Sequence, residues 1–241
     1  MIRDLFSRIL TRAAAPEALA WLAASVDRHA TSFHQRTFYY DFSGVSRHFD
    51  KHRGLSPAAD QLAELDRLAP GLGLTAWDEF RLARVILLLV LAEQDRATYL
   101  DALAQLLNTA DIREQAAIFA SLSLLPEAPD LVEAAIDGLR SNIIDIYDSI
   151  ALDNPFPAAH FPEAAWNQMV LKAFFIHRPL PRMVGLDARR NRALAKAIRD
   201  LAHERWAAGR DISPEAWRCC EPYPELFTEA DRAKGALVPV A

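Results

Sequence analysis

The residue types that could do chemistry gather in the last third of the chain. Asn154, His160, His203, Glu204 and Arg205 offer an amide, two imidazoles, a carboxylate and a guanidinium. Such groups could hold an anion or orient a small molecule. The same groups could equally fix a loop to a helix, and the two interpretations make different demands on their surroundings.

Arg205 is the most constrained of these residues. A helix is expected from Asp187, its N-cap, to Ala208, with Gly209 as the stop after it. Arg205 falls within the apolar stripe of this helix, and an unpaired buried charge is costly. The other members of the stripe are Leu194, Ile198, Leu201 and Ala202. Carboxylates that could pair with Arg205 belong to Asp153, Glu163 and Asp187, and backbone carbonyls of the Pro-bent loop could also serve. The structural interpretation is an arginine that ties this helix to the 153–163 loop. The functional alternative is an arginine that binds an anionic or amphipathic ligand.

Aromatic and polar side chains accompany this group. Trp166, Asn167 and Lys172 share one expected helix, and Trp206 and Trp217 follow. Tryptophan at helix-packing positions usually belongs to the core, and a buried asparagine usually bonds loop backbone. The candidate ligand- or partner-binding set comprises Asn154, His160, Trp166, Asn167, Lys172, His203, Glu204, Arg205 and Arg210.

Three further clusters could hold a metal ion or an anion. His48 and His52 are four residues apart, but no glutamate follows His48 as in a zinc-protease helix. We expect them to be surface histidines. The adjacent Cys219 and Cys220 are expected to be reduced thiols, so neither a metal nor a cofactor is predicted. The basic residues between 189 and 199 predict a solvated helix face, with a phosphate or acidic-partner patch as the alternative.

Composition excludes several classes of function. The chain has 241 residues, a net charge of −5 and only 8 glycines. No phosphate-binding loop, dinucleotide fingerprint, nucleophile elbow or catalytic Ser-His-Asp order is present. No global basic excess favours nucleic acid. We therefore assign no catalytic residue and lean toward a protein that is not an enzyme.

The elements that must position these residues are helices throughout. Scarce glycine and abundant alanine, leucine and arginine favour helix over strand. We expect helices near 2–13, 16–28, 56–69, 76–92, 95–108, 111–124, 130–152, 162–176, 187–208 and 213–219. The middle pairs align on each other with an offset of about 32 residues, which favours a HEAT-like α-solenoid over an irregular bundle.

The predicted organisation is one all-helical domain over 1–241. Within it we distinguish N-terminal helices with a His- and aromatic-rich segment (1–70), HEAT-like helix pairs (75–152), the block with the distinctive residues (153–220) and a peripheral tail (221–241).

The longest apolar run, 85–92, is too short to span a bilayer, and no secretory signal is present. We expect a cytoplasmic protein. Its first helix is amphipathic, so it could dock on the domain or associate with a membrane surface.

The block from 153 to 218 resembles the EboA-domain family. The stretches that carry the resemblance are DNPFPA at 153–158, HF at 160–161, AWNQMVLKA at 165–173, GLD at 185–187, AHERWAAGR at 202–210 and PEAWR at 214–218. The resemblance implies a bacterial gene cluster that also encodes a prenyltransferase and a TatD-like hydrolase, associated with synthesis or export of a secondary metabolite. It brings no catalytic residue with it.

Two hypotheses follow. The first is a non-enzymatic scaffold or adaptor whose partners are other proteins of the same gene cluster, acting on a prenyl-type or other secondary metabolite. The alternative is a binding protein or enzyme for an anionic or amphipathic small molecule, with a pocket around Arg205 and His160. A pocket with convergent polar groups would favour the alternative.

Overall fold

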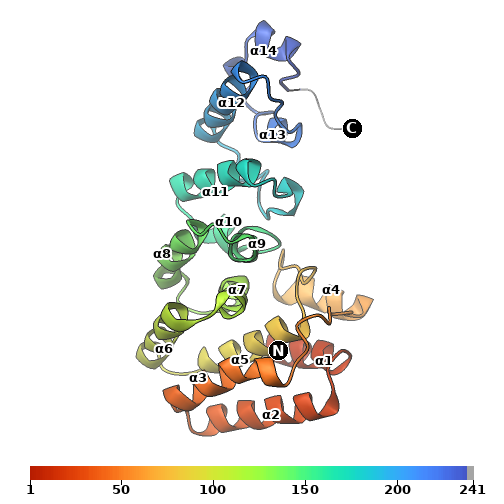
Figure 1. Cartoon of the computed structure of the whole chain (residues 1–241), viewed down its shortest axis with the longest axis vertical. Helices are drawn as coiled ribbons and strands as arrows, with labels where there is room; N and C mark the ends of the chain where they lie inside the picture. Colours follow the sequence, from red (N-terminus) through yellow and green to blue (C-terminus); the bar gives the residue numbers. More distant parts are fainter. Residues whose placement is uncertain (238–241) are drawn as a thin grey trace. The chain divides into compact units, whose positions relative to one another are not determined.

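The computed structural model describes residues 1–237 and consists of α-helices joined by short turns and 3-10 segments (Figure 1). The all-α prediction is confirmed, whereas a HEAT-like solenoid is not confirmed. The chain divides into two compact units, Met1–Phe156 and Pro157 onward, which are described separately. Of the predicted tail 221–241, the last four residues lie outside the described residues. The prediction of a single domain stays a prediction.

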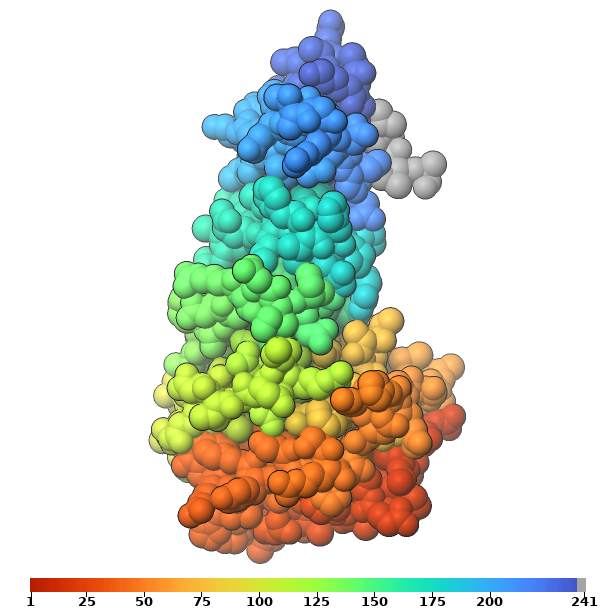
Figure 2. All heavy atoms as spheres, viewed as in Figure 1, coloured from red at the N-terminus to blue at the C-terminus, as the bar shows by residue number. Residues whose placement is uncertain are grey.

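The first unit contains the helices before Pro157 and the start of α10. They are α1 Ile2–Thr11, α2 Pro16–Thr31, α3 Gln35–Gly44, α4 Ala59–Leu68, α5 Glu79–Leu91, α6 Arg96–Thr109, α7 Ile112–Ala120, α8 Ala128–Leu139, α9 Ile144–Ala151 and α10 Phe156–His160, with 3-10 segments Val45–Arg47 and Leu122–Leu124. In Figure 2 the side chains of the N-terminal helices, coloured red to orange, form a continuous surface on the face shown.

Helix α5 forms the centre of this unit. The side chain of Asp78 caps it by accepting a hydrogen bond from the Arg81 amide at 2.7 Å, which satisfies one of the unpaired donors at the helix start. Nearly every residue of α5 is buried, and the helix packs against α1, α2 and α7. An apolar run that covers all sides of a helix requires such a position.

One charged residue lies inside this apolar helix. Arg84 is fully buried, and its Nε donates to the carbonyl of Phe42 at 3.2 Å. Its guanidinium lies 3.9 Å from the ring centroid of Phe80, and Glu114 approaches to 3.5 Å. A buried guanidinium is tolerable when cation–π contact and a nearby carboxylate compensate for lost water.

The amphipathic first helix docks on the protein. Leu5, Phe6, Ile9 and Leu10 are at most 1% exposed, and α1 packs against α4 and α5. Its apolar face is therefore covered, which confirms the docking interpretation for this face. Among the described residues no helix combines the length and the apolarity that crossing a bilayer would need.

The prediction of one helix over 130–152 is wrong. The chain forms α8 and α9 instead, separated at Arg140–Ile143, where the Ser141 hydroxyl accepts the Ile143 amide at 3.1 Å. Ile143 lies in this break and is 38% exposed. Serine and asparagine at 141 and 142 offer the backbone local hydrogen bonds that compete with helix, and the break lets α9 pack on both α7 and α8.

The second unit contains α11 Glu163–Phe175, α12 Arg192–Ala207, α13 Glu215–Arg218 and α14 Glu229–Ala233, with 3-10 segments Leu180–Arg182 and Pro224–Leu226. Helix α12 packs on α11 and on the 3-10 segment at Pro224–Leu226. Both Pro162 before α11 and Pro214 before α13 stand at helix starts, where proline removes no helical hydrogen bond.

The ends of α12 test the predicted boundaries. The cap is Asn191, whose side chain accepts from the Leu194 amide at 2.8 Å, and not Asp187 as expected. The predicted stop at Gly209 is confirmed: its φ is +67°, and the Arg210 amide bonds the Arg205 carbonyl at 2.8 Å. This is a Schellman end, which glycine accommodates without strain.

Candidate functional site

Asn154, the first predicted site residue, uses its side chain in hydrogen bonds within the first unit. It is 2% exposed, and its amide nitrogen donates to the carbonyls of Phe119 and Ser149, each at 3.0 Å. Its amide oxygen accepts the backbone N–H of Phe156 at 3.0 Å. Both donors and one acceptor position are thereby used within the first unit, so this side chain fixes the turn after α9.

Arg205 does not have the acceptor that we expected. Its Nε donates to the main-chain carbonyl of Asp211, six residues ahead, at 2.7 Å. One of the expected carboxylates, Asp187, pairs with Arg218 instead. The bond of Arg205 is local to the turn after α12 because that turn folds back at Gly209.

The other polar residues near the end of α12 point to the surface. Glu204 and Arg210 are exposed, as is His160 at the end of α10. His203 is 49% exposed, and its Nε2 lies 2.6 Å from the Asp231 carboxylate of α14. Burial acts to raise the pKa of Asp231. The hydrogen bonds from Thr228 and from His203 lower it by more, so the pKa of this carboxyl lies below its usual range.

Trp166 and Asn167 belong to the packing of α11. Trp166 is 1% exposed, and the Arg189 guanidinium lies 5.0 Å from its ring centroid. Asn167 and Asn191 exchange two side-chain hydrogen bonds of 3.2 and 2.8 Å, which join α11 to the start of α12. Lys172, on the same helix, is half-buried.

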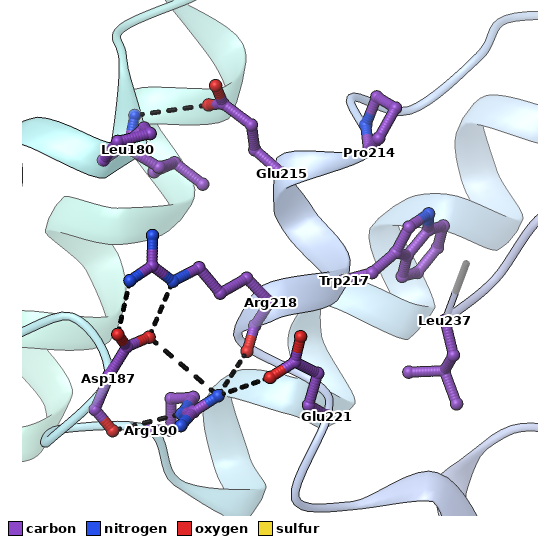
Figure 3. Close-up of a pocket in the computed structure, with 10 residues that line it drawn as sticks. Leu180, Asp187, Arg190, Pro214, Glu215, Trp217, Arg218, Glu221 and Leu237 are labelled. Carbon is purple, nitrogen blue, oxygen red and sulfur yellow. Dashed lines mark hydrogen bonds and ion pairs between the residues drawn. The ribbon is translucent and has the colours of Figure 1, made fainter. Parts of the chain in front are cut away.

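The predicted set has eight residues in the second unit and one, Asn154, in the first. None of its nine residues is among those that line a pocket of the second unit. That pocket, of about 490 Å³, is drawn in Figure 3. Its walls come from the 3-10 segment at Leu180, the loop before α12, and α13 with the residues after it. Its lining residues are Leu180, Pro181, Asp187, Arg190, Pro214, Glu215, Trp217, Arg218, Glu221 and Leu237.

Charged side chains form one wall of this pocket. Arg218 makes a two-pronged ion pair with Asp187, with its Nε 2.8 Å from one oxygen and its Nη2 bonded to the other. Arg190 Nη1 bonds Glu221 at 2.8 Å and the Arg218 carbonyl at 3.0 Å (Figure 3). Two-pronged arginine–carboxylate pairs fix geometry as well as charge. The wall is therefore in place before a ligand arrives.

The electrostatics of this wall favour permanent charge. The hydrogen bond from Arg218 lowers the pKa of Asp187, and the same bond raises the pKa of Arg218. Each partner favours the ionised form of the other. Neither group is poised to exchange a proton near neutral pH, which a general acid or base must do.

The opposite side of the pocket is apolar. Trp217 is 4% exposed and belongs to an aromatic row, with ring centroids 6.0 Å from Trp206 and 5.9 Å from Phe227. Leu237 lies beside Trp217 on this side, whereas Leu180 lies across the pocket beyond Arg218 (Figure 3). Burying the edges of such a row stabilises α13 against α12.

The sequence also drew attention to the pair His48 and His52 and to the pair Cys219 and Cys220. His48 and His52 are exposed, and the His48 ring stacks on Trp21 at 4.2 Å. They line an open hollow of about 610 Å³ in the first unit. Among the described residues there is no group of three or more His, Cys, Asp or Glu suited to a metal. Cys219 and Cys220 are free and buried, and burial raises the pKa of each to about 12.

Three of the five basic residues between 189 and 199 are paired with carboxylates within the unit. Arg190 pairs with Glu221, Arg192 with Glu225 and Arg199 with Asp200. Arg189 Nη1 donates to the carbonyls of Pro157 and Ala158. Arginines whose donors are already used make a poor phosphate patch.

Comparison with known proteins adds the family. A family model described as metabolite traffic protein EboA matches residues 2–221. The chain belongs to the EboA family. The match confirms the resemblance and extends it over the first helices. No curated protein and no solved structure gives a significant match. The description of the EboA family indicates a role in metabolite traffic.

Sequence reasoning missed the charged wall of the pocket, although it contained a signal. Asp187 and Arg218 are 31 residues apart, so no local spacing relates them. They nevertheless belong to two of the stretches that resemble the EboA family, 185–187 and 214–218. The structure brings these two stretches together at the pocket (Figure 3).

Proposed function

We propose that this EboA-family chain binds a small amphipathic metabolite in the pocket of its second unit and releases it chemically unchanged. The observation that carries this proposal is the pocket between Arg218 and Trp217. It combines a charged wall, fixed by Arg218–Asp187 and Arg190–Glu221, with an apolar wall on Trp217 and Leu237.

Two properties of the pocket support binding. Its volume of about 490 Å³ lies within the range of about 300–1,000 Å³ that ligand pockets occupy. Its charged groups are ordered by one another, which reduces the entropy that a ligand must supply to order them. The family description, which refers to metabolite traffic, agrees with a protein that holds and passes on a small molecule.

The same wall argues against chemistry on the ligand. Asp187 and Arg218 hold each other in the charged form, as their pKa directions indicate. The nearby thiols are buried and have a pKa of about 12, so they are not nucleophiles near neutral pH. A carrier or adaptor for metabolites therefore fits these groups better than an enzyme.

The proposal is tested with 2-naphthalenemethanol, an uncharged probe with an apolar body and one hydroxyl. Amide resonances of the full chain are followed by NMR as the probe is added. We expect saturable shifts at Leu180, Trp217 and Arg218, and unchanged probe on mass spectrometry. Saturable shifts confined to other regions, or none at all, would overturn the proposal.

Two arginine variants make this test specific. Arg218→Met removes the guanidinium of the charged wall, and we expect it to weaken probe binding about tenfold. Arg210→Met makes the same change at an exposed residue outside the pocket and should bind like the unchanged protein. If the Arg210 variant loses binding and the Arg218 variant does not, the sequence-predicted site holds the probe.

The second candidate is the scaffold that binds proteins of the same gene cluster. The observation that favours it is apolar exposure in the first unit. Ile112 at the start of α7 is 46% exposed and Ile144 at the start of α9 is 41% exposed, and these two helices pack together. An exposed isoleucine at an interface loses binding when it is charged. Co-purification with tagged proteins of the cluster should fail for Ile144→Asp and persist for Asp145→Asn.

A further inference from the structure

The charges that line the pocket do not cancel. Its lining contains the carboxylates of Asp187, Glu215 and Glu221 against the guanidiniums of Arg190 and Arg218. The ionised lining therefore carries one net negative charge, three negative against two positive. A pocket of one sign favours ligands of the opposite sign and disfavours ligands of the same sign.

The positive charges are already committed. Arg218 uses its Nε and Nη2 on Asp187, and Arg190 uses its Nε on the Asp187 carbonyl and its Nη1 on Glu221. A ligand carboxylate or phosphate would have to displace one of these carboxylates. Displacement would replace one ion pair by another and leave a lining carboxylate unpaired, which brings no net gain.

The negative charges retain unused capacity. One oxygen of Glu215 accepts the Leu180 amide at 3.3 Å, and no hydrogen bond is described for its other oxygen. In Figure 3 that second oxygen points away from Leu180. The second oxygen of Glu221 points away from Arg190 in the same view. These oxygens can accept hydrogen bonds from a ligand without breaking an existing contact.

One donor also remains. The third nitrogen of the Arg218 guanidinium is joined to no partner in Figure 3 and points toward Leu180. It can donate to a hydroxyl or carbonyl of a ligand. The remaining surface of the pocket, on Trp217, Leu237 and Leu180, is apolar. The complementary molecule has an apolar body, a donor-rich end and no negative charge.

We propose that the pocket selects a cationic amphipathic ligand, an apolar body bearing a protonated amine, over a neutral analogue, and that it disfavours carboxylates and phosphates. This inference rests on the proposed function and gives the chemical class of the metabolite. It differs from the anionic ligand expected around Arg205, because the arginines that the structure places in the pocket are paired with carboxylates.

The test compares three probes that share one ring system and differ in charge. They are 2-naphthylmethylamine, 2-naphthalenemethanol and 2-naphthoate, titrated into the full chain by calorimetry at pH 7. We expect the amine to bind tightest and the carboxylate weakest. An exposed ion pair changes affinity by a factor of up to about five. Because the pocket attracts the amine and repels the carboxylate, the two effects add, and the affinities of these two probes should differ by about tenfold. Added salt should narrow this difference.

A charge-neutral variant locates the selecting group. Glu215→Gln keeps an oxygen for the Leu180 amide but removes the negative charge. We expect it to weaken amine binding about threefold and to weaken alcohol binding by a smaller factor, because the amide oxygen still accepts a hydrogen bond but carries no charge. Glu204→Gln makes the same change at an exposed residue outside the pocket and should leave both affinities unchanged. Equal loss in the two variants would assign the preference to the net charge of the protein and overturn the proposal.

The outcomes separate the two proposals. If the alcohol binds in the pocket and the carboxylate binds as tightly as the amine or tighter, the pocket is a binding site and the inferred ligand class is wrong. If none of the three probes binds at the pocket residues, the proposed function itself is wrong. The neutral alcohol, whose binding needs no charge preference, makes this distinction.

Discussion

Replacing Asn154 should cost stability rather than ligand binding. Its side chain makes three buried hydrogen bonds, to the carbonyls of Phe119 and Ser149 and from the amide of Phe156. Each buried hydrogen bond contributes about 1 kcal/mol net. Asn154→Ala should therefore lower the free energy of unfolding by about 3 kcal/mol, a large share of the total of about 5–15 kcal/mol for a domain.

Asn154→Asp gives a sharper result because its cost depends on pH. A carboxylate can still accept the Phe156 amide, but it faces two carbonyl oxygens to which the asparagine donated at 3.0 Å. This environment disfavours the charged form and raises the pKa of the new carboxyl above about 3.9 in the folded state. A raised folded pKa means that stability is lost as pH rises through it. We expect a cost of about 4 kcal/mol at pH 8 and about 2 kcal/mol at pH 5.

Urea unfolding followed by far-UV circular dichroism measures both variants, provided that the slope with denaturant is unchanged. The control is Asn142→Asp in the exposed turn between α8 and α9, where we expect a change within about 0.5 kcal/mol. The reasoning fails if Asn154→Ala is as stable as the unchanged protein. It also fails if the cost of Asn154→Asp is the same at both pH values.

Three further predictions concern other parts of the core. Gly138→Ala should destabilise the first unit by about 1 kcal/mol, because the new Cβ would lie 2.7 Å from Cζ of Phe119 and overpacking outweighs the gain in helix propensity. Thermal melting measures the effect, and a raised melting temperature would contradict the prediction. Cys219 and Cys220 are buried, and the pKa of each thiol is about 12. Ellman's reagent should therefore label neither thiol of the folded protein within minutes at pH 8, and should label both in 6 M urea. Rapid labelling of the folded protein would show that α13 opens. Burial lowers the pKa of His29, so protonation favours the unfolded state and stability should fall as pH drops below about 6.5, by at most about 1.4 kcal/mol per pH unit. Urea midpoints at pH 7.5 and 5.5 should show a smaller drop for His29→Gln, and an equal drop would assign the pH dependence to other groups.

The sequence predicted what depends on local periodicity. The apolar stripe of α12, with Leu194, Ile198 and Leu201, is buried as expected, and Gly209 ends that helix. The docking face of α1 follows from the same periodicity. In each case residues three and four apart determine which face meets the core, and a single glycine in the left-handed region ends the helix.

The sequence did not predict pairings between distant residues. Arg84 is surrounded by apolar neighbours in the chain, and only the fold brings Glu114 and the Phe80 ring to it. The apolar helical face of Arg205 predicts a distant acceptor, a carboxylate or a carbonyl of the 153–163 loop, but the turn at Gly209 supplies the nearby carbonyl of Asp211. Spacing along a helix says which face a side chain occupies and not which acceptor a loop brings to it.

The reciprocal amides of Asn167 and Asn191 have a consequence for how this family varies. Asn191 has two tasks, because its oxygen also caps the Leu194 amide at 2.8 Å, whereas Asn167 bonds Asn191. Serine or aspartate at 191 would retain the cap but would change what position 167 must donate or accept. In an alignment of relatives the two positions should therefore covary, with 191 restricted to capping residues and 167 changing to match it.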